Sequence, residues 1–175
     1  MKVSIIIPAR YKSSRLPGKP LISILNIPMI IRVADICKKV VGVENVFIAT
    51  DDKRISKKAK EFGYKFIITS KKCLTGTDRV AEASKKINSD IIVNVQGDEP
   101  LLNPQDIKKI IKEKKKYFDQ VINGYSDIED NLEPSNKNIP KVIFNNKKNL
   151  IYMSRNLLPG HKKNAPSPNK YFKQV

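Results

Sequence analysis

The sequence predicts an α/β fold, a doubly wound and mostly parallel sheet with helices on both faces. Short apolar segments alternate with segments whose apolar residues recur at helical spacing. The apolar segments, such as 3–7, are nearly continuous in Ile and Val, as expected for strands covered on both faces. With 175 residues and 40% hydrophobic content, the chain is long and apolar enough for a single domain with a core.

Seven strands are expected along the chain. Each is a short apolar run bounded by polar, Gly or Pro residues. The last two are separated by a polar segment with several prolines, and the final run resembles the beginning of a strand. In order they are 3–7, 46–49, 66–69, 91–95, 120–123, 141–144 and 171–175.

Helices are expected between the first five strands. Pro28 is suited to the first helical position, where its missing N–H group would have no partner in any case. Asp52 is expected to cap the second helix, which Gly63 ends. Thr77 is expected to cap the third helix, and the fourth is expected to begin at 103–104. Ligands of such sheets bind beyond the carboxyl ends of the strands, so the loops that follow the strands are the candidate site.

The loop after the first strand is rich in cations and conformationally restricted. Arginine can bind phosphate oxygens through two parallel hydrogen bonds, and lysine can act as a point charge. The loop therefore predicts a site for a polyanion such as a nucleoside triphosphate, although an ordinary basic surface loop is the alternative. It is not a Walker A loop, because Ser13 and Pro20 stand where that motif needs Gly and Ser or Thr. Its cations are Arg10, Lys12, Arg15 and Lys19, and Pro8, Pro17, Gly18 and Pro20 restrict it.

Two carboxylates follow directly on the predicted strand 91–95. Asp98 and Glu99 supply the oxygen ligands that suit Mg²⁺, which commonly takes one or two protein carboxylates and substrate phosphates. Gly97 allows the backbone to approach a ligand closely. The alternative is a solvent-exposed acidic turn.

Two further segments are candidates for ligand contacts. Hydroxyls and backbone amides at 75–79 suit a base edge or a phosphate, although Asp78 can equally be a partner of the helix dipole. Asp51 lies at the end of the second strand and could belong to the site, whereas capping fully explains its neighbour Asp52. Arg155 is the only Arg in the C-terminal half, which suggests a bidentate carboxylate or phosphate partner or a structural salt bridge.

The net charge of +17 invites a nucleic-acid interpretation, but the pattern argues against it. Only six of the 34 basic residues are Arg, and the Lys residues are spread along the whole chain with few aromatics among them. The densest run, 108–116, is expected to be a solvated helix face. Cys37 and Cys73 lack metal-site spacing and are expected to be free thiols. Neither a signal peptide nor a membrane span is expected, so the protein is expected to be cytoplasmic, with no nucleic-acid or membrane partner.

Taken together, the motifs resemble the 3-deoxy-manno-octulosonate cytidylyltransferase family, also called CMP-Kdo synthetases. They occur in the family's order and spacing and cover essentially the whole chain. The motifs are Ile7-Pro8-Ala9-Arg10 with Ser13, Arg15-Leu16-Pro17-Gly18-Lys19-Pro20-Leu21, Thr50-Asp51, Thr75-Gly76-Thr77-Asp78-Arg79, Asn94-Val95-Gln96-Gly97-Asp98-Glu99-Pro100, and Lys141-Val142 followed by Ser154-Arg155.

The resemblance implies a Rossmann-like nucleotidyltransferase fold and transfer of CMP from CTP to Kdo, an acidic eight-carbon sugar, with release of pyrophosphate. The activated sugar would serve lipopolysaccharide synthesis. By the same resemblance, Asp98 would hold Mg²⁺. The residues implied in catalysis are Arg10, Arg15, Lys19 and Asp98, the first three on the triphosphate. Those implied in substrate binding are Ala9, with Thr75, Gly76, Thr77 and Arg79 at cytosine and ribose, and Gln96, Ser154 and Arg155 towards the sugar acid.

The chain also departs from this family. It is expected to be one nucleotidyltransferase domain, 1–175, that lacks the family's C-terminal part, including the dimer-forming segment and a late Asp that is a second metal ligand. Gln174 stands where the family commonly has a His. Two alternatives therefore remain: a truncated CTP-binding domain without turnover, and an enzyme for a related acidic or amino sugar.

Overall fold

A computed structural model describes residues 1–12, 16–128, 132–162, 166, 168 and 170–174. It forms two compact units, Met1–Tyr117 and Phe118–Val175. That the two units act together as one nucleotidyltransferase domain stays a prediction. Within the described ranges, no helix combines the length and apolar character needed to cross a membrane.

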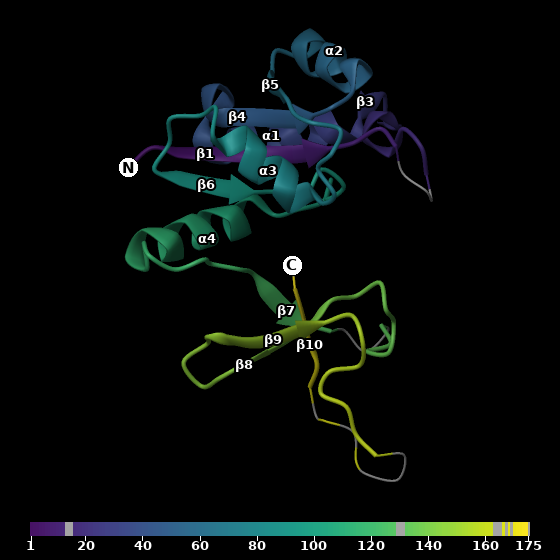
Figure 1. Cartoon of the computed structure of the whole chain (residues 1–175), viewed down its shortest axis with the longest axis vertical. Helices are drawn as coiled ribbons and strands as arrows, with labels where there is room; N and C mark the ends of the chain where they lie inside the picture. The colour runs from purple at the N-terminus through teal and green to yellow at the C-terminus, as the bar shows by residue number, and fades with distance from the viewer. Residues whose placement is uncertain (13–15, 129–131, 163–165, 167, 169, 175) are drawn as a thin grey trace. The chain divides into compact units, whose positions relative to one another are not determined.

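The first unit is built on a four-stranded parallel sheet in the order β5-β4-β1-β6 (Figure 1). The central strand β1 pairs with β4 on one side and β6 on the other, so that Ile6 lies between Phe47 and Asn94. The four strands predicted in this part of the chain are confirmed, with ends shifted by one or two residues. They are β1 Val3–Ala9, β4 Val46–Thr50, β5 Lys65–Ile68 and β6 Ile91–Asn94.

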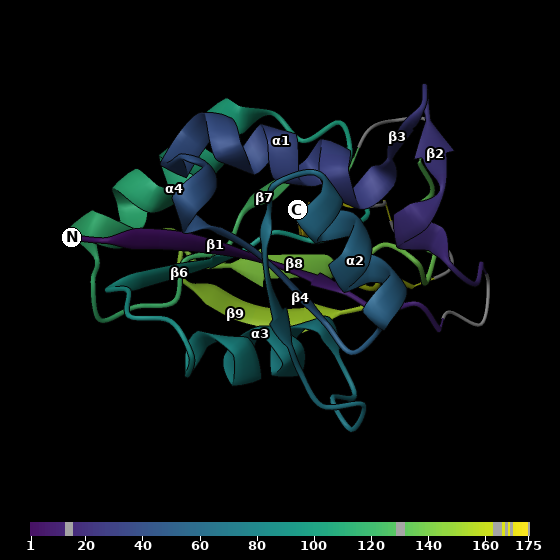
Figure 2. The same ribbon diagram turned by 90° about the horizontal axis from the view of Figure 1, so that it is seen from above.

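Helices cover both faces of this sheet, as expected for a doubly wound fold. Figure 2 shows α1 and α4 on one side of the strands and α3 on the other. The alternation of side chains along β1 explains the two layers, since Ile5 and Ile7 belong to the larger core cluster and Ile6 to the smaller one. The helices are α1 Met29–Val41, α2 Lys53–Glu61, α3 Gly76–Ser84 and α4 Pro104–Lys116.

Two of the four predicted helix starts are confirmed and two are wrong. Asp52 accepts from the Arg54 amide at 2.9 Å, and Asn103 accepts from the Gln105 amide at 3.0 Å, as capping requires. Pro28 lies just outside α1, because it pairs with Ser23 in a hairpin of β2 Ser23–Ile24 and β3 Ile27–Pro28. The third helix is capped by Thr75 rather than Thr77, since Thr75 and Asp78 form a reciprocal capping box.

Short 3-10 turns complete this unit. One, η1 Lys19–Leu21, follows the basic loop, and the other, η2 Val43–Asn45, leads into β4. Gly18 begins the first of these turns with a φ of 72°, a conformation that favours glycine. The basic loop therefore leads directly into an ordered turn.

The second unit is a four-stranded antiparallel sheet in the order β7-β10-β8-β9. Its strands are β7 Tyr125–Asp127, β8 Lys141–Phe144, β9 Leu150–Ser154 and β10 Phe172–Gln174. The predicted strand at 141–144 is confirmed, and the described part of 171–175 contains β10. The predicted strand at 120–123 is wrong, because pairing with β10 selects the segment that begins at Tyr125; β9 was not predicted.

Candidate functional site

The carboxyl ends of β1, β4, β5 and β6 meet at one edge of the parallel sheet, as parallel pairing requires. The loops that follow these strands carry most of the predicted site residues. Arg10 and Lys12 are exposed after β1, and Asp98 and Glu99 are exposed after β6. Ser13 and Arg15, which belong to the prediction for the basic loop, lie outside the described residues.

The basic loop and the acidic segment meet directly. The Lys19 ammonium donates to Asp98 Oδ2 at 2.7 Å, and both side chains are partly exposed. The structure therefore places Lys19, which is predicted to bind the triphosphate, beside Asp98, which is predicted to bind the metal ion. A cation and a carboxylate together at the carboxyl edge can bind the phosphates of a nucleotide and its metal ion.

Close packing brings three loops together at this edge. A Cβ atom on Gly97 would lie 2.9 Å from the carbonyl oxygen of Pro8, so only glycine fits there. A Cβ atom on Gly76 would lie 3.3 Å from Gln96 Oε1 and from Pro8 Cγ. The close approach at Gly97 is thus a contact within the fold, whereas the sequence had suggested an approach to a ligand.

The predicted nucleotide segment 75–79 begins helix α3. The Thr75 amide and hydroxyl donate to Asp78 Oδ2 at 2.9 Å and 2.8 Å, and the Asp78 amide donates to Thr75 Oγ1 at 3.1 Å. Asp78 therefore has the structural role that was its alternative interpretation. Thr77 is exposed at the same helix end. Its hydroxyl makes no hydrogen bond with another described residue, so it is available to a ligand.

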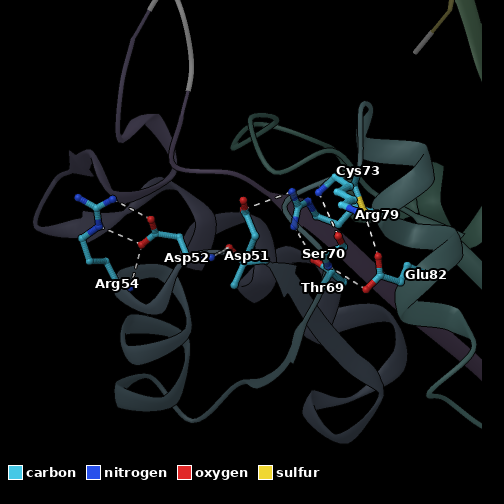
Figure 3. Close-up of polar contacts among 10 residues, drawn as sticks. Asp51, Asp52, Arg54, Thr69, Ser70, Cys73, Arg79 and Glu82 are labelled. Carbon is cyan, nitrogen blue, oxygen red and sulfur yellow. Dashed lines mark hydrogen bonds and ion pairs between the residues drawn. The ribbon is translucent and has the colours of Figure 1, made fainter.

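Arg79 is almost completely buried, with 3% of its surface exposed. Its guanidinium donates to the Thr69 hydroxyl and lies 3.2 Å from Asp51 Oδ1 (Figure 3). That carboxylate oxygen is buried and forms no hydrogen bond with another described residue, so the pair is held mainly by charge. Arg79 thus joins the start of α3 to the ends of β4 and β5. The sequence contained both residues but no local signal that pairs them.

A second ion pair lies beside the first. Arg54 donates to both carboxylate oxygens of Asp52, at 2.9 Å and 2.7 Å (Figure 3). These hydrogen bonds hold the pKa of Asp52 below its usual value, since they favour the ionised carboxylate. Neither the sequence pattern nor the resemblance singled out Arg54.

In the second unit, the predicted residues Ser154 and Arg155 follow strand β9. Arg155 donates to the backbone carbonyls of Lys137 and Asn138 at 3.2 Å and 3.1 Å, so its described partners are neutral. The sequence had suggested a carboxylate, a phosphate or a salt bridge. Ser154 Oγ accepts from the Asn156 amide at 3.0 Å.

Lys141 is fully buried beside Arg155; the sequence placed it in a predicted strand and in one of the family motifs but gave no sign of its burial. Its ammonium donates to the carbonyls of Asn136 and Arg155 at 2.9 Å and 2.6 Å. Burial, and to a smaller extent the nearby Arg155 charge, lowers the pKa of Lys141. The ammonium therefore links the end of β9 to the segment before β8.

The described residues contain no cluster of three or more His, Cys, Asp or Glu side chains that could hold a metal ion by itself. Asp98 is exposed, and its carboxylate accepts a hydrogen bond from the Lys19 ammonium. One or two carboxylates at the mouth of a phosphate site are a usual protein contribution to Mg²⁺ binding, with substrate phosphates and water completing the sphere. The donor set fits magnesium held jointly with a nucleotide.

Known proteins are similar to this chain over most of its length. Residues 4–174 match the family model described as Cytidylyltransferase. The 3-deoxy-manno-octulosonate cytidylyltransferase of Escherichia coli is 37% identical over 99% of this chain and 70% of its own length. The mitochondrial 3-deoxy-manno-octulosonate cytidylyltransferase of Arabidopsis thaliana is 40% identical over 94% of this chain and 57% of its own length.

Two other similar proteins extend the comparison. The 8-amino-3,8-dideoxy-manno-octulosonate cytidylyltransferase of Shewanella pealeana is 37% identical over 91% of this chain and 67% of its own length. The solved structure of a CMP:2-keto-3-deoxy-manno-octonic acid synthetase complexed with CTP has a TM-score of 0.89 and 37% identity. That similarity covers 100% of this chain and 72% of the other.

Proposed function

Because the chain belongs to the cytidylyltransferase family, we propose that it transfers CMP from CTP to Kdo and releases pyrophosphate. The observation that carries the proposal is the contact between Lys19 and Asp98, which joins the basic loop to the acidic segment. The similarity to a synthetase solved with CTP supports the nucleotide, and the names of the relatives support the sugar. The product would be the activated sugar for lipopolysaccharide synthesis.

In this proposal the basic loop binds the triphosphate. Arg10, Arg15 and Lys19 would neutralise the phosphates and stabilise the negative charge that develops on pyrophosphate as it leaves. Asp98 would hold Mg²⁺, which supplies charge neutralisation on the phosphate oxygens when bound. The reaction then depends on positioning the sugar hydroxyl near the α-phosphate, because phosphoryl transfer needs little covalent help from the protein.

The remaining predicted residues would recognise the two substrates. Ala9 is a proposed substrate contact at the carboxyl edge. Thr75, Gly76 and Thr77 would contact cytosine and ribose, Thr77 through its exposed hydroxyl. Arg79 would act by shaping this segment, since its side chain is buried. Gln96 of the first unit would contact the sugar acid. In the second unit, Ser154 and Arg155 are proposed substrate-binding residues.

A second candidate is the same reaction on an amino sugar. It is favoured by the Shewanella relative named for 8-amino-3,8-dideoxy-manno-octulosonate, whose identity to this chain equals that of the Escherichia coli relative. The cytoplasm is the proposed location for either reaction, and the two free cysteines support a reducing compartment.

The test combines calorimetry with a turnover assay. The proposal expects CTP to bind, and pyrophosphate to be released only when CTP, Mg²⁺ and Kdo are all present, with CMP-Kdo identified by mass spectrometry. A higher kcat/KM with the 8-amino sugar would select the second candidate. Binding of CTP without release for either sugar would leave a CTP-binding domain without turnover, and no binding of CTP would refute the proposal.

A further inference from the structure

Arg54, at the start of α2, stacks on the aromatic ring of Tyr11 in the basic loop. The central carbon of the guanidinium lies 3.2 Å from the centre of the ring. Asp52 fixes the edge of the same guanidinium through two hydrogen bonds of 2.9 Å and 2.7 Å. A planar guanidinium held along its edge and on its face keeps little rotational freedom.

The ring of Tyr11 also lies against Gly18. A Cβ atom on Gly18 would come within 3.1 Å of three atoms of the ring, and the Gly18 amide donates to the Tyr11 carbonyl at 2.9 Å. Gly18 directly precedes Lys19, whose ammonium contacts Asp98. A continuous set of contacts therefore runs from Asp52 through Arg54, Tyr11 and Gly18 to Lys19.

The space between the loop and α2 is otherwise open. A cavity of about 510 Å³ lies there, and Tyr11, Gly18 and Arg54 are among its lining residues. The side chain of Lys57 on α2 also lines it and makes no hydrogen bond or ion pair with another described side chain, although its charge helps to lower the pKa of Glu61. The stack is one of the contacts that join this side of the loop to the helix, while Tyr11 and Leu21 also pack against the larger core cluster.

We propose that Arg54, oriented by Asp52, is a positioning residue that holds Tyr11 and thereby places Lys19 for binding the triphosphate. In this arrangement one face of the Arg54 guanidinium is covered by Tyr11, and its charge is paired with Asp52. The inference rests on the proposed function for the identity of the anion. The arrangement of the loop itself does not depend on that identity.

The first test measures CTP binding and turnover in two variants and their controls. Arg54→Met removes the stacked cation and Tyr11→Leu removes the ring, and each is expected to raise Kd and KM for CTP about tenfold. The value of kcat should fall as well, because Lys19 would also stabilise the negative charge that develops on the leaving pyrophosphate. Tyr11→Phe keeps the ring, and Lys57→Met removes one positive charge from the same helix; both controls should bind CTP normally.

The second test needs no nucleotide. Amide hydrogen exchange at Gly18 and Leu21, whose amides are bonded to the Tyr11 and Gly18 carbonyls, reports the order of the loop. Exchange should become about tenfold faster in Arg54→Met, because loss of the stacking contact makes local opening of the loop more favourable. It should stay unchanged in Lys57→Met. Arg54→Met is the decisive variant if Tyr11→Leu does not fold, because Arg54 is exposed on the surface.

The outcomes separate the two proposals. Unchanged exchange in Arg54→Met would refute the positioning role, as would an equal loss of CTP affinity in Lys57→Met, which would indicate an effect of net charge alone. If the unaltered protein does not bind CTP and Arg54→Met still loosens the loop, the proposed function fails and the positioning role of Arg54 stands.

Discussion

The Lys19 ammonium and the Asp98 carboxylate, 79 positions apart in the sequence, meet at 2.7 Å across the carboxyl edge of the sheet. Their side chains are 38% and 50% exposed, so the pair contributes less than about 1 kcal/mol to folding. A weak pair is easily exchanged for stronger partners. A triphosphate can bind Lys19 and a metal ion can bind Asp98, each replacing the other residue as partner. This contact is therefore suited to a binding site.

The Asp98→Asn variant should lose turnover but retain binding of CTP in the absence of metal. The amide keeps the size of the side chain and removes the charge that would hold Mg²⁺, so kcat should fall at least about 100-fold. Pyrophosphate release and calorimetry with and without Mg²⁺ measure the two effects. Asp119→Asn removes an exposed carboxylate elsewhere and serves as the control; near-normal turnover in Asp98→Asn would remove Asp98 from the mechanism.

Thr75→Ala should destabilise the protein by about 1 kcal/mol, the usual cost of losing an N-cap side chain. Thr75→Ser retains the hydroxyl that accepts from the Asp78 amide and should stay close to the unaltered protein. Urea unfolding measures the difference. Thr77→Ala tests the alternative cap, and a larger loss there than in Thr75→Ala would contradict the observed capping box.

Arg79→Met should destabilise the protein by about 3 kcal/mol, because it leaves the Asp51 carboxylate without its cation near the core. Adding Asp51→Asn should recover part of this loss, since the amide carries no charge that needs compensation. The neighbouring surface pair is the matched control, and Arg54→Met should destabilise the protein less than Arg79→Met does, because Arg54 is exposed. Equal losses for the two arginines would show that burial does not distinguish the pairs.

The stabilising effect of Asp52 should disappear in acid. The Arg54 guanidinium lowers the pKa of Asp52 in the folded protein, so this contribution is fully present above the unfolded value of about 3.9 and is lost as the pH falls through the lower folded value. The stability difference between the unaltered protein and Asp52→Asn should therefore shrink between pH 5 and pH 2, in the range set by that reference value of about 3.9. Urea midpoints measure it, and a difference independent of pH would exclude an ionised pair.

Cys37 should resist thiol reagents until the protein unfolds. It is completely buried, and burial raises its pKa to about 12, so almost no reactive thiolate forms at neutral pH. Cys73 is only partly buried and should supply the thiol that reacts in the folded state, slowly because its pKa is raised as well. A thiol assay on Cys73→Ser checks the assignment, since rapid labelling of that variant would show that Cys37 is accessible.

The sequence was informative wherever structure depends on neighbours in the chain. The Ile-rich run of β1, the Asp52 cap and the Asn103-Pro104 start of α4 all carry local signals, and each was predicted. The cap of α3 was misplaced by two residues, although Thr75 and Asp78 have the spacing of a capping box. Strand β9 was not predicted, although residues 150–153 form an apolar run; four of its five residues are exposed in the fold, which such a run does not indicate.

By itself, the sequence determined the parallel sheet, its helices and the loops that carry the candidate site. The spacing of apolar residues and the positions of turn residues are local features that can be read from neighbours in the chain. Only the tertiary structure decided that Arg79 is buried against Asp51, that Tyr125 begins the strand beside β10, and that Arg54 stacks on Tyr11. These contacts join residues that are distant along the chain, so they depend on how the strands and helices pack. Folding brings these partners within a few ångströms, and no local pattern encodes that distance.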